Sequence, residues 1–334
     1  MARANRQDVA KLAGVSTAVV SYVINNGPRP VATATRERVL AAMEQLAYRP
    51  NAAARALKLA RTNVVGLAVN DLTNPFFAEF AGYLQDIAFK AGYAVMIANI
   101  GQDGSWESGQ LQSIVDREVD GIIAFGLRSS GTLESLQASG LPIVSMDWAM
   151  HDKSVRAVTI DEHAGTRLAL DHLIEHGHDE VAFIGGLGDP TLRYQSWLDA
   201  MRPRTSARRL KELQEQDEFN ERGGYRAARR LLDGKRKRPS ALFVASDVQA
   251  FGVLRTAYEL RLSIPDDLAV VSFDGTVASQ FTCPALSVVE LPLEQMATLS
   301  FQKLFDDDEA LEQHTTLEHR LVIRESCGHH QPAR

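Results

Sequence analysis

The sequence predicts a small all-α head over residues 1–49 and an α/β core over residues 63–334, built as two doubly wound parallel-sheet lobes. Three observations predict this division. Apolar residues recur at helical spacing as far as residue 46, which is typical of short amphipathic helices. From Val64 onwards, apolar strands alternate with amphipathic helices, which is the pattern of a parallel sheet. The 334 residues also exceed the ~250–300 at which a single core stops growing.

Three helices are expected in the head. The first begins after Asn5, ends at Gly14 and has an apolar face made of Val9, Leu12 and Ala13. Ser16 caps the second, whose apolar face consists of Val19, Val20, Val23 and Ile24. The third is expected from Thr35 to Leu46, with an apolar face of Val39, Leu40, Met43 and Leu46. Two short helices joined by a turn that contains glycine form a helix-turn-helix.

The core is expected to alternate strands with helices. Strands are predicted at Val64–Val69, Tyr93–Ala98, Gly121–Phe125, Pro142–Met146, Val181–Ile184, Ala241–Val244 and Leu268–Ser272. About ten strand–helix steps favour two sheets, each with its own lobe. We expect the N-terminal lobe over about 63–162 and 291–318, and the C-terminal lobe over about 163–290 and 319–327.

The net charge of −6 conceals an asymmetry between the two ends of the chain. Through Arg61 there are ten Arg and Lys residues against three Asp and Glu residues, which leaves the rest of the chain acidic. A basic head on an acidic body indicates that only the head meets a polyanion, although a solvated basic face would give the same composition.

Composition excludes several classes of protein. No apolar run approaches the ~20 residues of a membrane span, and the N-terminus lacks the pattern of a secretory signal. The only cysteines, Cys283 and Cys327, make no disulfide framework and no metal site. We therefore expect a cytoplasmic, nucleoid-associated protein that needs no cofactor and no metal.

The resemblance to a known family lies in ordered blocks along the chain. These are Asp8–Asn25, Thr35–Val39, Tyr48–Leu57, Val119–Ile123, His172–His178 and Ser272–Asp274. Together they resemble the lactose/galactose-repressor (LacI/GalR) family of transcriptional regulators. The resemblance implies a homodimer that binds near-palindromic operator DNA through its two helix-turn-helix heads. It also implies a periplasmic-binding-protein-like core, type I, that binds a small effector, a sugar or nucleoside-like molecule, and controls operator affinity allosterically.

The family pattern assigns the DNA contacts. Base contacts fall on the second helix of the head, at Thr17, Ala18 and Tyr22, because the first turn of a recognition helix faces the major groove. For Tyr22, packing against the head is an alternative. Phosphate contacts are expected from Ser16, Ser21, Asn25 and Arg29. The segment 50–62 resembles the family hinge helix, in which Leu57 would wedge into the minor groove beside Ala54, Arg55 and Lys58. A plain linker is the alternative.

The family pattern also assigns effector contacts in the core: Phe76, Phe77, Asp147, Trp148, Arg193, Phe219, Asp247 and Asp274. Aromatic rings suit the flat face of a sugar or base, and one of the two adjacent phenylalanines is equally consistent with core packing. Two departures put this set in doubt. The stretch before Arg193 is shorter than usual, and the charge-rich stretch from Arg202 to Gln216 lacks the usual short strand.

Two other classes of protein compete with this interpretation. A periplasmic-type binding protein without DNA function would share the core, but it would not need the basic head. An enzyme would need a nucleophile–base pair or a phosphate loop, and Gly185–Gly188 lacks the spacing of a dinucleotide-binding turn. No heptad run follows Arg324, so a dimer is expected rather than a tethered tetramer.

Overall fold

The computed structural model describes residues 4–25, 29–49, 61–102, 104–127, 130–146, 155–187, 192–234, 237–305 and 313–328. The chain divides into two compact units, Met1–Asn63 and Val64–Arg334. No helix among the described residues is long and apolar enough to cross a membrane.

The first unit contains three helices: α1 (Arg6–Ala13), α2 (Thr17–Asn25) and α3 (Thr33–Gln45). The predicted caps of α1 are confirmed, because Asn5 and Asp8 form a capping box and Gly14 ends the helix with φ of 65°. The Ser16 hydroxyl accepts the Val19 N–H at 3.3 Å at the start of α2. The small core of this unit consists of Val9, Ala10, Ala13, Val20, Val23, Val39 and Ala42.

Two of the predicted core residues of the head are exposed. Leu12 is 46% exposed and Leu40 is 49% exposed, so these assignments are wrong. On a helix that turns by about 100° per residue, Leu12 points roughly 100° away from the direction shared by Val9, Ala10 and Ala13. The apolar face of α1 is therefore narrower than the sequence pattern indicated, and Ala10 belongs to it.

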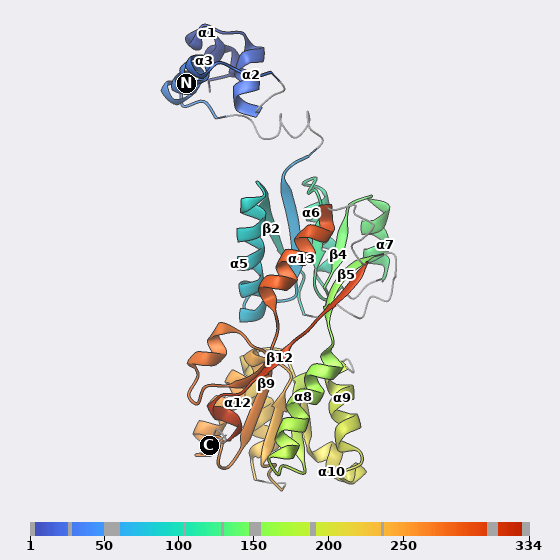
Figure 1. Cartoon of the computed structure of the whole chain (residues 1–334). Coiled ribbons are helices and arrows are strands. Elements are labelled where there is room, and N and C mark those ends of the chain that lie inside the picture. Colours follow the sequence, from blue (N-terminus) through green and yellow to red (C-terminus); the bar gives the residue numbers. More distant parts are fainter. Residues whose placement is uncertain are drawn as a thin grey trace. The chain divides into compact units, whose positions relative to one another are not determined.

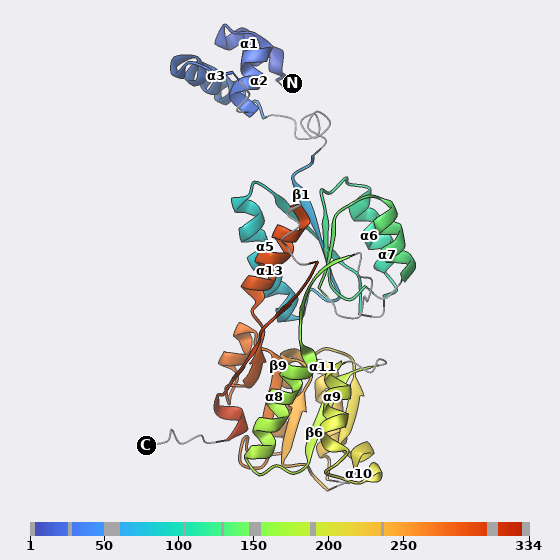
Figure 2. The same ribbon diagram turned by 45° about the vertical axis from the view of Figure 1, so that its right-hand side comes forward.

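The second unit begins with a six-stranded parallel sheet in the order β11-β5-β4-β3-β1-β2. Its strands are β1 (Val64–Val69), β2 (Ala94–Asn99), β3 (Ile122–Ala124), β4 (Ile143–Ser145), β5 (Arg156–Ile160) and β11 (His314–Leu317). Its helices are α5 (Pro75–Lys90), α6 (Glu107–Val115), α7 (Ser130–Ala138) and α13 (Leu293–Phe305). Figures 1 and 2 show α5 and α13 on one face of this sheet and α6 and α7 on the other.

A second six-stranded sheet follows in the order β12-β10-β9-β8-β6-β7, parallel except for β12 against β10. Its strands are β6 (Val181–Gly186), β7 (Gln214–Asp217), β8 (Ala241–Val244), β9 (Ala269–Asp274), β10 (Ser287–Glu290) and β12 (Arg320–Val322). Its α-helices are α8 (Glu162–Glu175), α9 (Leu192–Met201), α10 (Ala207–Glu212), α11 (Glu221–Leu232) and α12 (Asp247–Glu259). Two short 3-10 helices, η1 (Val277–Phe281) and η2 (Glu325–Cys327), complete it.

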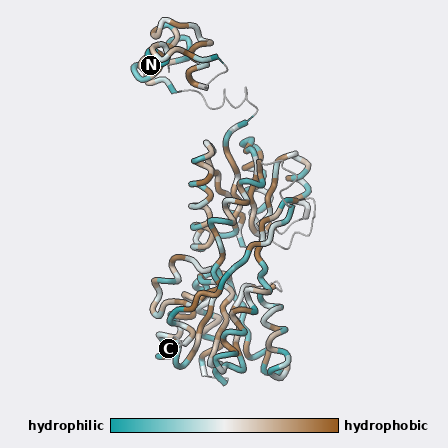
Figure 3. Tube along the Cα trace, in the orientation of Figure 1, coloured by the Kyte–Doolittle hydropathy of each residue, from teal (hydrophilic) through white to brown (hydrophobic). Residues whose placement is uncertain are grey.

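Three segments join the two lobes: β5 runs into α8, β10 into α13, and β11 into β12. Figure 1 shows the last of these as a long ribbon that passes from one sheet to the other. Hydropathy follows the layers, because the inner strands of both sheets are apolar while the outer helices carry mixed residues (Figure 3). In doubly wound sheets, ligands bind beyond the carboxyl ends of the strands. The space between the two lobes is therefore the place to look for a site.

The expectation that Arg202 to Gln216 contains no strand is wrong. β7 occupies Gln214–Asp217 at the edge of the second sheet and pairs only with β6. The strand was missed because all four of its residues are polar, and hydrophobic alternation is the signal by which a strand is recognised. An edge strand tolerates such a sequence when its charged side chains find partners on a neighbouring helix.

Candidate functional site

A cavity of about 480 Å³ lies between the two lobes of the second unit. Residues that directly follow strands of the first sheet contribute one wall: Asn70, Asp71, Phe125, Gly126 and Met146. The other wall comes from strand ends and helix starts of the second sheet: Glu162, Gly186, Arg193, Glu218, Phe219, Ala245 and Asp274. This is the position at which doubly wound sheets bind ligands.

The wall from the first lobe is aromatic. Phe76 lies edge-on to Phe77 and to Phe125, with centroid distances of 5.1 and 5.6 Å, and Phe77 lies 5.3 Å from Phe125. The Asn74 side chain caps α5 by accepting the Phe76 N–H at 3.0 Å. This cap fixes the start of α5, whose first turn carries Phe76 and Phe77. Phe76 is only 9% exposed, whereas Phe77 is half-buried, so both rings line the cavity while Phe76 also belongs to the core.

A glycine makes room for the amide beside these rings. Gly126 has φ of 64°, and a Cβ on it would lie 2.1 Å from Asn70 Nδ2. Any other residue would therefore push Asn70 out of its place, since contacts below about 3 Å are not tolerated. Asn70 Oδ1 is buried and has no hydrogen-bond partner among the described residues.

A single arginine organises the wall from the second lobe. Arg193 donates to Glu162 Oε1 at 2.7 Å and to the backbone oxygen of Ala245. Its Nη1 lies 3.7 Å from Asp274 Oδ1, and its guanidinium lies 4.0 Å from the centroid of the Phe273 ring. The Arg193 Nε is buried without a hydrogen-bond partner among the described residues. The Arg193 guanidinium is thus held by the protein on two sides, which fixes its orientation.

Asp274 ends β9 at the floor of the cavity. Its φ of 111° lies in a region that few residues other than glycine adopt. Burial raises the pKa of Asp274 well above its usual value, although the neighbouring Arg193 charge opposes that rise. A carboxyl held in an unusual backbone conformation inside a cavity is typical of a functional position.

Asp247 was expected beside the effector, but it does not line the cavity. It is almost fully buried, and its carboxylate accepts hydrogen bonds from the Ser272 hydroxyl at 2.5 Å and from the Thr276 N–H at 2.7 Å. Burial raises its pKa to about 6, against the effect of these donors. Asp247 begins α12, and the protein itself occupies both of its carboxylate oxygens. Through Thr276 it holds the backbone that follows Asp274.

Phe219 lines the cavity from the loop that follows β7. A Cβ on Gly186 would lie 2.9 Å from Phe219 Cδ2, so the ring packs directly on that glycine. The shortened and charge-rich stretches had put the family positions of Arg193 and Phe219 in doubt. In the structure both side chains line the same cavity.

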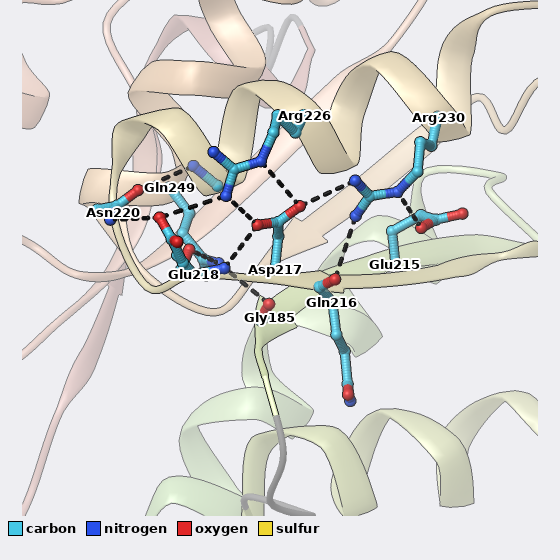
Figure 4. Close-up of polar contacts among 10 residues, drawn as sticks. Gly185, Glu215, Gln216, Asp217, Glu218, Asn220, Arg226, Arg230 and Gln249 are labelled. Carbon is cyan, nitrogen blue, oxygen red and sulfur yellow. Dashed lines mark hydrogen bonds and ion pairs between the residues drawn. The ribbon is translucent and has the colours of Figure 1, made fainter. Parts of the chain in front are cut away.

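An ion-pair network fixes the loop that carries Phe219, and Figure 4 shows it. Asp217 accepts hydrogen bonds from Arg226 and, at 2.8 Å, from Arg230. Gln249 Nε2 donates to the backbone oxygens of Gly185 and Glu218 at 3.0 and 3.2 Å. Burial opposes ionisation of Asp217, but the arginine hydrogen bonds outweigh it and lower its pKa to about 2.

Six polar residues of the cavity were missed by the sequence: Asn70, Asp71, Asn74, Gln102, Glu162 and Glu218. Asn70 and Asp71 directly follow β1, Glu218 directly follows β7, and Glu162 follows β5 after one residue, so a search for polar residues at strand ends would have found four of them. Gln102 lies in a loop and carried no such signal. The predicted contacts Asp147 and Trp148 lie outside the described residues.

The candidate DNA-reading surface lies on α2 of the first unit. Ser16, Thr17 and Ala18 are exposed, and Ser21 and Tyr22 are half-buried. Val20 and Val23 of the same helix are buried, which leaves the first turn directed to solvent. Arg29 is also exposed. The side chain of Asn25, and the hinge residues Ala54, Arg55, Leu57 and Lys58, lie outside the described residues.

A helix-turn-helix unit joined to a two-lobed core with a cavity at its strand ends defines a ligand-regulated DNA-binding protein as the class. Residues 7–51 match the family described as bacterial regulatory proteins, lacI family, and residues 170–327 match a periplasmic binding protein-like domain. The chain is 32% identical over 332 residues to the HTH-type transcriptional repressor PurR of Pectobacterium atrosepticum, covering 95% of this chain and 96% of that protein.

Further relatives agree. The ribose operon repressor of Escherichia coli K12 is 32% identical over 306 residues, which cover 90% of this chain and 92% of that protein. The structure of the transcriptional regulator CelR in complex with cellobiose aligns with a TM-score of 0.70 and 29% identity, covering 97% of this chain and all of that one. A Lac repressor dimer bound to operator and the anti-inducer ONPF has the same fold, with a TM-score of 0.84, 23% identity, and coverage of 97% and 99%.

The chain belongs to the lacI family of bacterial regulatory proteins. It is a DNA-binding transcriptional regulator with a ligand-binding core, as the sequence predicted, and the alternative of a binding protein without DNA function is not supported. The curated relatives named above are transcriptional repressors.

Proposed function

We propose that this protein is a homodimeric repressor that binds a near-palindromic operator and whose operator affinity is set by a small sugar or nucleoside-like effector in the cavity between the lobes. The observation that carries the proposal is the cavity of about 480 Å³, which combines an aromatic wall with the Arg193–Asp274 pair. Aromatic faces and paired polar groups are the means by which proteins bind hydroxylated rings.

The DNA contacts follow from the exposed first turn of α2. Thr17 can hydrogen-bond to a base edge, Ala18 offers a methyl contact, and Tyr22 lies one turn further on. Ser16, Ser21, Asn25 and Arg29 serve as phosphate contacts that set the register of the head. The named repressors among the relatives support this assignment.

The hinge assignment rests on the family resemblance alone. Leu57 is expected to wedge into a base step of the minor groove, with Ala54, Arg55 and Lys58 beside it. Replacing Leu57 with alanine should weaken operator binding by a few kcal/mol and leave the cavity unaffected.

Regulation follows from the two walls of the cavity. Phe76 and Phe77 belong to one lobe, and Arg193, Phe219 and Asp274 to the other. A ligand that contacts both sets favours one angle between the lobes. In a dimer, that angle sets the spacing of the two hinge segments, and effector and operator are then coupled reciprocally in binding free energy.

Selection of binding sites from random duplex DNA tests the DNA part of the proposal. We expect a near-palindrome with half-sites about one helical turn apart. Affinity should fall with salt at a log–log slope of about −0.9 for each phosphate contact. Unpaired motifs or salt-independent binding would contradict the proposal. Titration of the selected site with and without cavity ligands then tests the regulation.

A further inference from the structure

We infer that the effector carries no negative charge, and that Glu162 is the residue by which the cavity excludes anionic relatives of its ligand. The inference rests on the proposed function of the cavity and narrows the chemical class of its occupant. It excludes phosphorylated sugars, nucleotides and sugar acids, which are otherwise similar in shape to the neutral compounds.

The charges that line the cavity are predominantly negative. Among the described lining residues, one arginine, Arg193, stands against four acidic residues: Asp71, Glu162, Glu218 and Asp274. Burial raises the pKa of Asp274, but three carboxylates remain even when that group is protonated. A ligand with a phosphate or carboxylate would add a further negative charge to this enclosed space.

Arg193, the one cation among the described lining residues, already has partners within the protein. Arg193 directs one terminal nitrogen to Glu162 Oε1 at 2.7 Å and the other to the Ala245 backbone oxygen, with Asp274 at 3.7 Å. The side chain of Glu162 is 25% exposed, so its charge is only partly screened by solvent. The Arg193–Glu162 pair therefore presents a neutral, polar surface to the cavity.

The two other acidic residues of the lining, Asp71 and Glu218, add no positive charge that could attract an anion. Glu218 pairs with Arg226 at 3.3 Å, but Arg226 is shared with Asp217 and does not line the cavity. Among the described residues, Asp71 pairs with no cation, and it accepts hydrogen bonds from Thr73 at 2.6 Å and Gln102 at 2.9 Å. Asp71 therefore adds a carboxylate to the lining of the cavity without a compensating cation among the described residues.

The uncharged groups favour a hydroxylated ring. Phe76, Phe77 and Phe125 give an apolar wall. Asn70 and Arg193 both line the cavity, and each has a buried polar atom, Asn70 Oδ1 and Arg193 Nε, that lacks a hydrogen-bond partner among the described residues. A hydroxyl both donates and accepts, and it brings no charge.

Matched pairs of compounds test the inference on the wild-type protein. Thermal unfolding is followed with neutral pentoses, hexoses, disaccharides and nucleosides, and with the phosphate or uronic acid counterpart of each. We expect a neutral compound to raise the Tm and its anionic counterpart to bind at least ~10-fold more weakly, since ~1.4 kcal/mol of repulsion corresponds to tenfold. An anionic member that binds as well as its neutral counterpart, or a panel with no neutral binder, would overturn the inference.

The variant Glu162→Gln tests the residue itself without knowledge of the effector. The substitution keeps the size of the side chain and leaves Arg193 without its neutralising partner, so millimolar inorganic sulfate should raise the Tm of the variant and not that of the wild type. Chloride at equal ionic strength is the reference. Glu212→Gln, which removes a carboxylate paired with Arg208 and Arg209 on α10 outside the cavity, is the matched control and should respond to sulfate as the wild type does.

The outcomes separate two kinds of failure. If the Glu162→Gln variant responds to sulfate no more than the control, or if the wild type already responds, Glu162 does not exclude anions. If neutral compounds bind but never alter operator affinity, the charge selectivity holds and the proposed regulation fails instead.

Discussion

Gln102 Nε2 lies 3.1 Å from the backbone oxygen of Phe219, and this hydrogen bond joins the two lobes at the cavity. The same nitrogen donates its other hydrogen to Asp71 Oδ2 at 2.9 Å. Both hydrogens of the amide are thus used, one within its own lobe and one across the cleft. The loop that carries Phe219 is held from the opposite lobe as well as by the ion pairs of Asp217 with Arg226 and Arg230.

The first prediction concerns this bridge. Gln102→Ala should lower the free energy of unfolding by about 2–3 kcal/mol, because it removes two hydrogen bonds, one of them to the Asp71 carboxylate. Gln102→Glu should cost more at pH 7, because it places a carboxylate against Asp71 and against a carbonyl oxygen, and less at pH 4, where carboxylates protonate. Urea denaturation at both pH values measures the difference. Equal losses for the two variants at pH 7 would show that the bridge is not formed in solution.

The second prediction concerns the brace beneath Phe219. The pKa of Asp217 is lowered to about 2, from an ordinary value of 3.8. A carboxyl whose pKa is lower in the folded state stabilises the protein above its unfolded pKa, and this contribution disappears as the pH falls from about 4 to about 2. The contribution at pH 7 is of the order of 2 kcal/mol.

Asp217→Asn should remove most of that contribution at pH 7 and flatten the loss of stability between pH 4 and pH 2. Chemical denaturation across this range makes the comparison, with Asp199→Asn, which removes the carboxylate of an exposed pair with Arg202, as the surface control. A variant whose stability still falls as steeply as that of the wild type would assign the acid sensitivity to other carboxylates.

The fold could be predicted from the sequence wherever burial leaves a periodic signal. The inner strands such as β1 and β8 are almost wholly buried and apolar, and they were found. β7 was not found, because its stability comes from ion pairs with Arg226 and Arg230 on α11, which lie nine or more residues away in the chain. Leu12 looked like a core residue because the pattern does not state how wide the apolar face of a helix is.

The candidate site could be predicted in part, for a related reason. Phe77, Arg193 and Asp274 occupy positions that the family pattern fixes, and they meet in the cavity. Asp247 matched the same rule of strand ends, yet Ser272 and Thr276 occupy its carboxylate. Whether a polar group faces a ligand or the protein depends on its hydrogen-bond partners, and these lie far away in the sequence.

The third prediction concerns the DNA-reading helix. Tyr22→Phe keeps the half-buried ring and removes the hydroxyl, so it should relax the preference at one base pair of each half-site by ~1–3 kcal/mol. Binding to the selected palindrome and to its single-base variants measures the change. Arg29→Ala is the contrasting variant: it should weaken all sequences alike and reduce the salt slope by about 1. If Tyr22→Phe shows the same base preferences as the wild type, Tyr22 packs against the head and does not contact a base.

The last prediction joins the cavity to the operator. Asp274→Asn suits the site, because asparagine tolerates a positive φ better than most residues and keeps the size of the side chain. It removes a carboxylate that faces Arg193 at 3.7 Å and that lies at the floor of the cavity. Because the substitution leaves α2 and the head unchanged, operator affinity without ligand should equal that of the wild type.

The response to ligand should differ between the two proteins. With the neutral compound that most raises the Tm of the wild type, the ratio of operator Kd values with and without ligand should depart from unity for the wild type and be about one for Asp274→Asn. Fluorescence anisotropy titrations of the selected operator give both ratios, and Glu212→Gln serves as the control that retains the response. If the variant responds as fully as the wild type, Asp274 is not an effector anchor. If the wild type does not respond at saturating ligand, the coupling between cavity and head is absent.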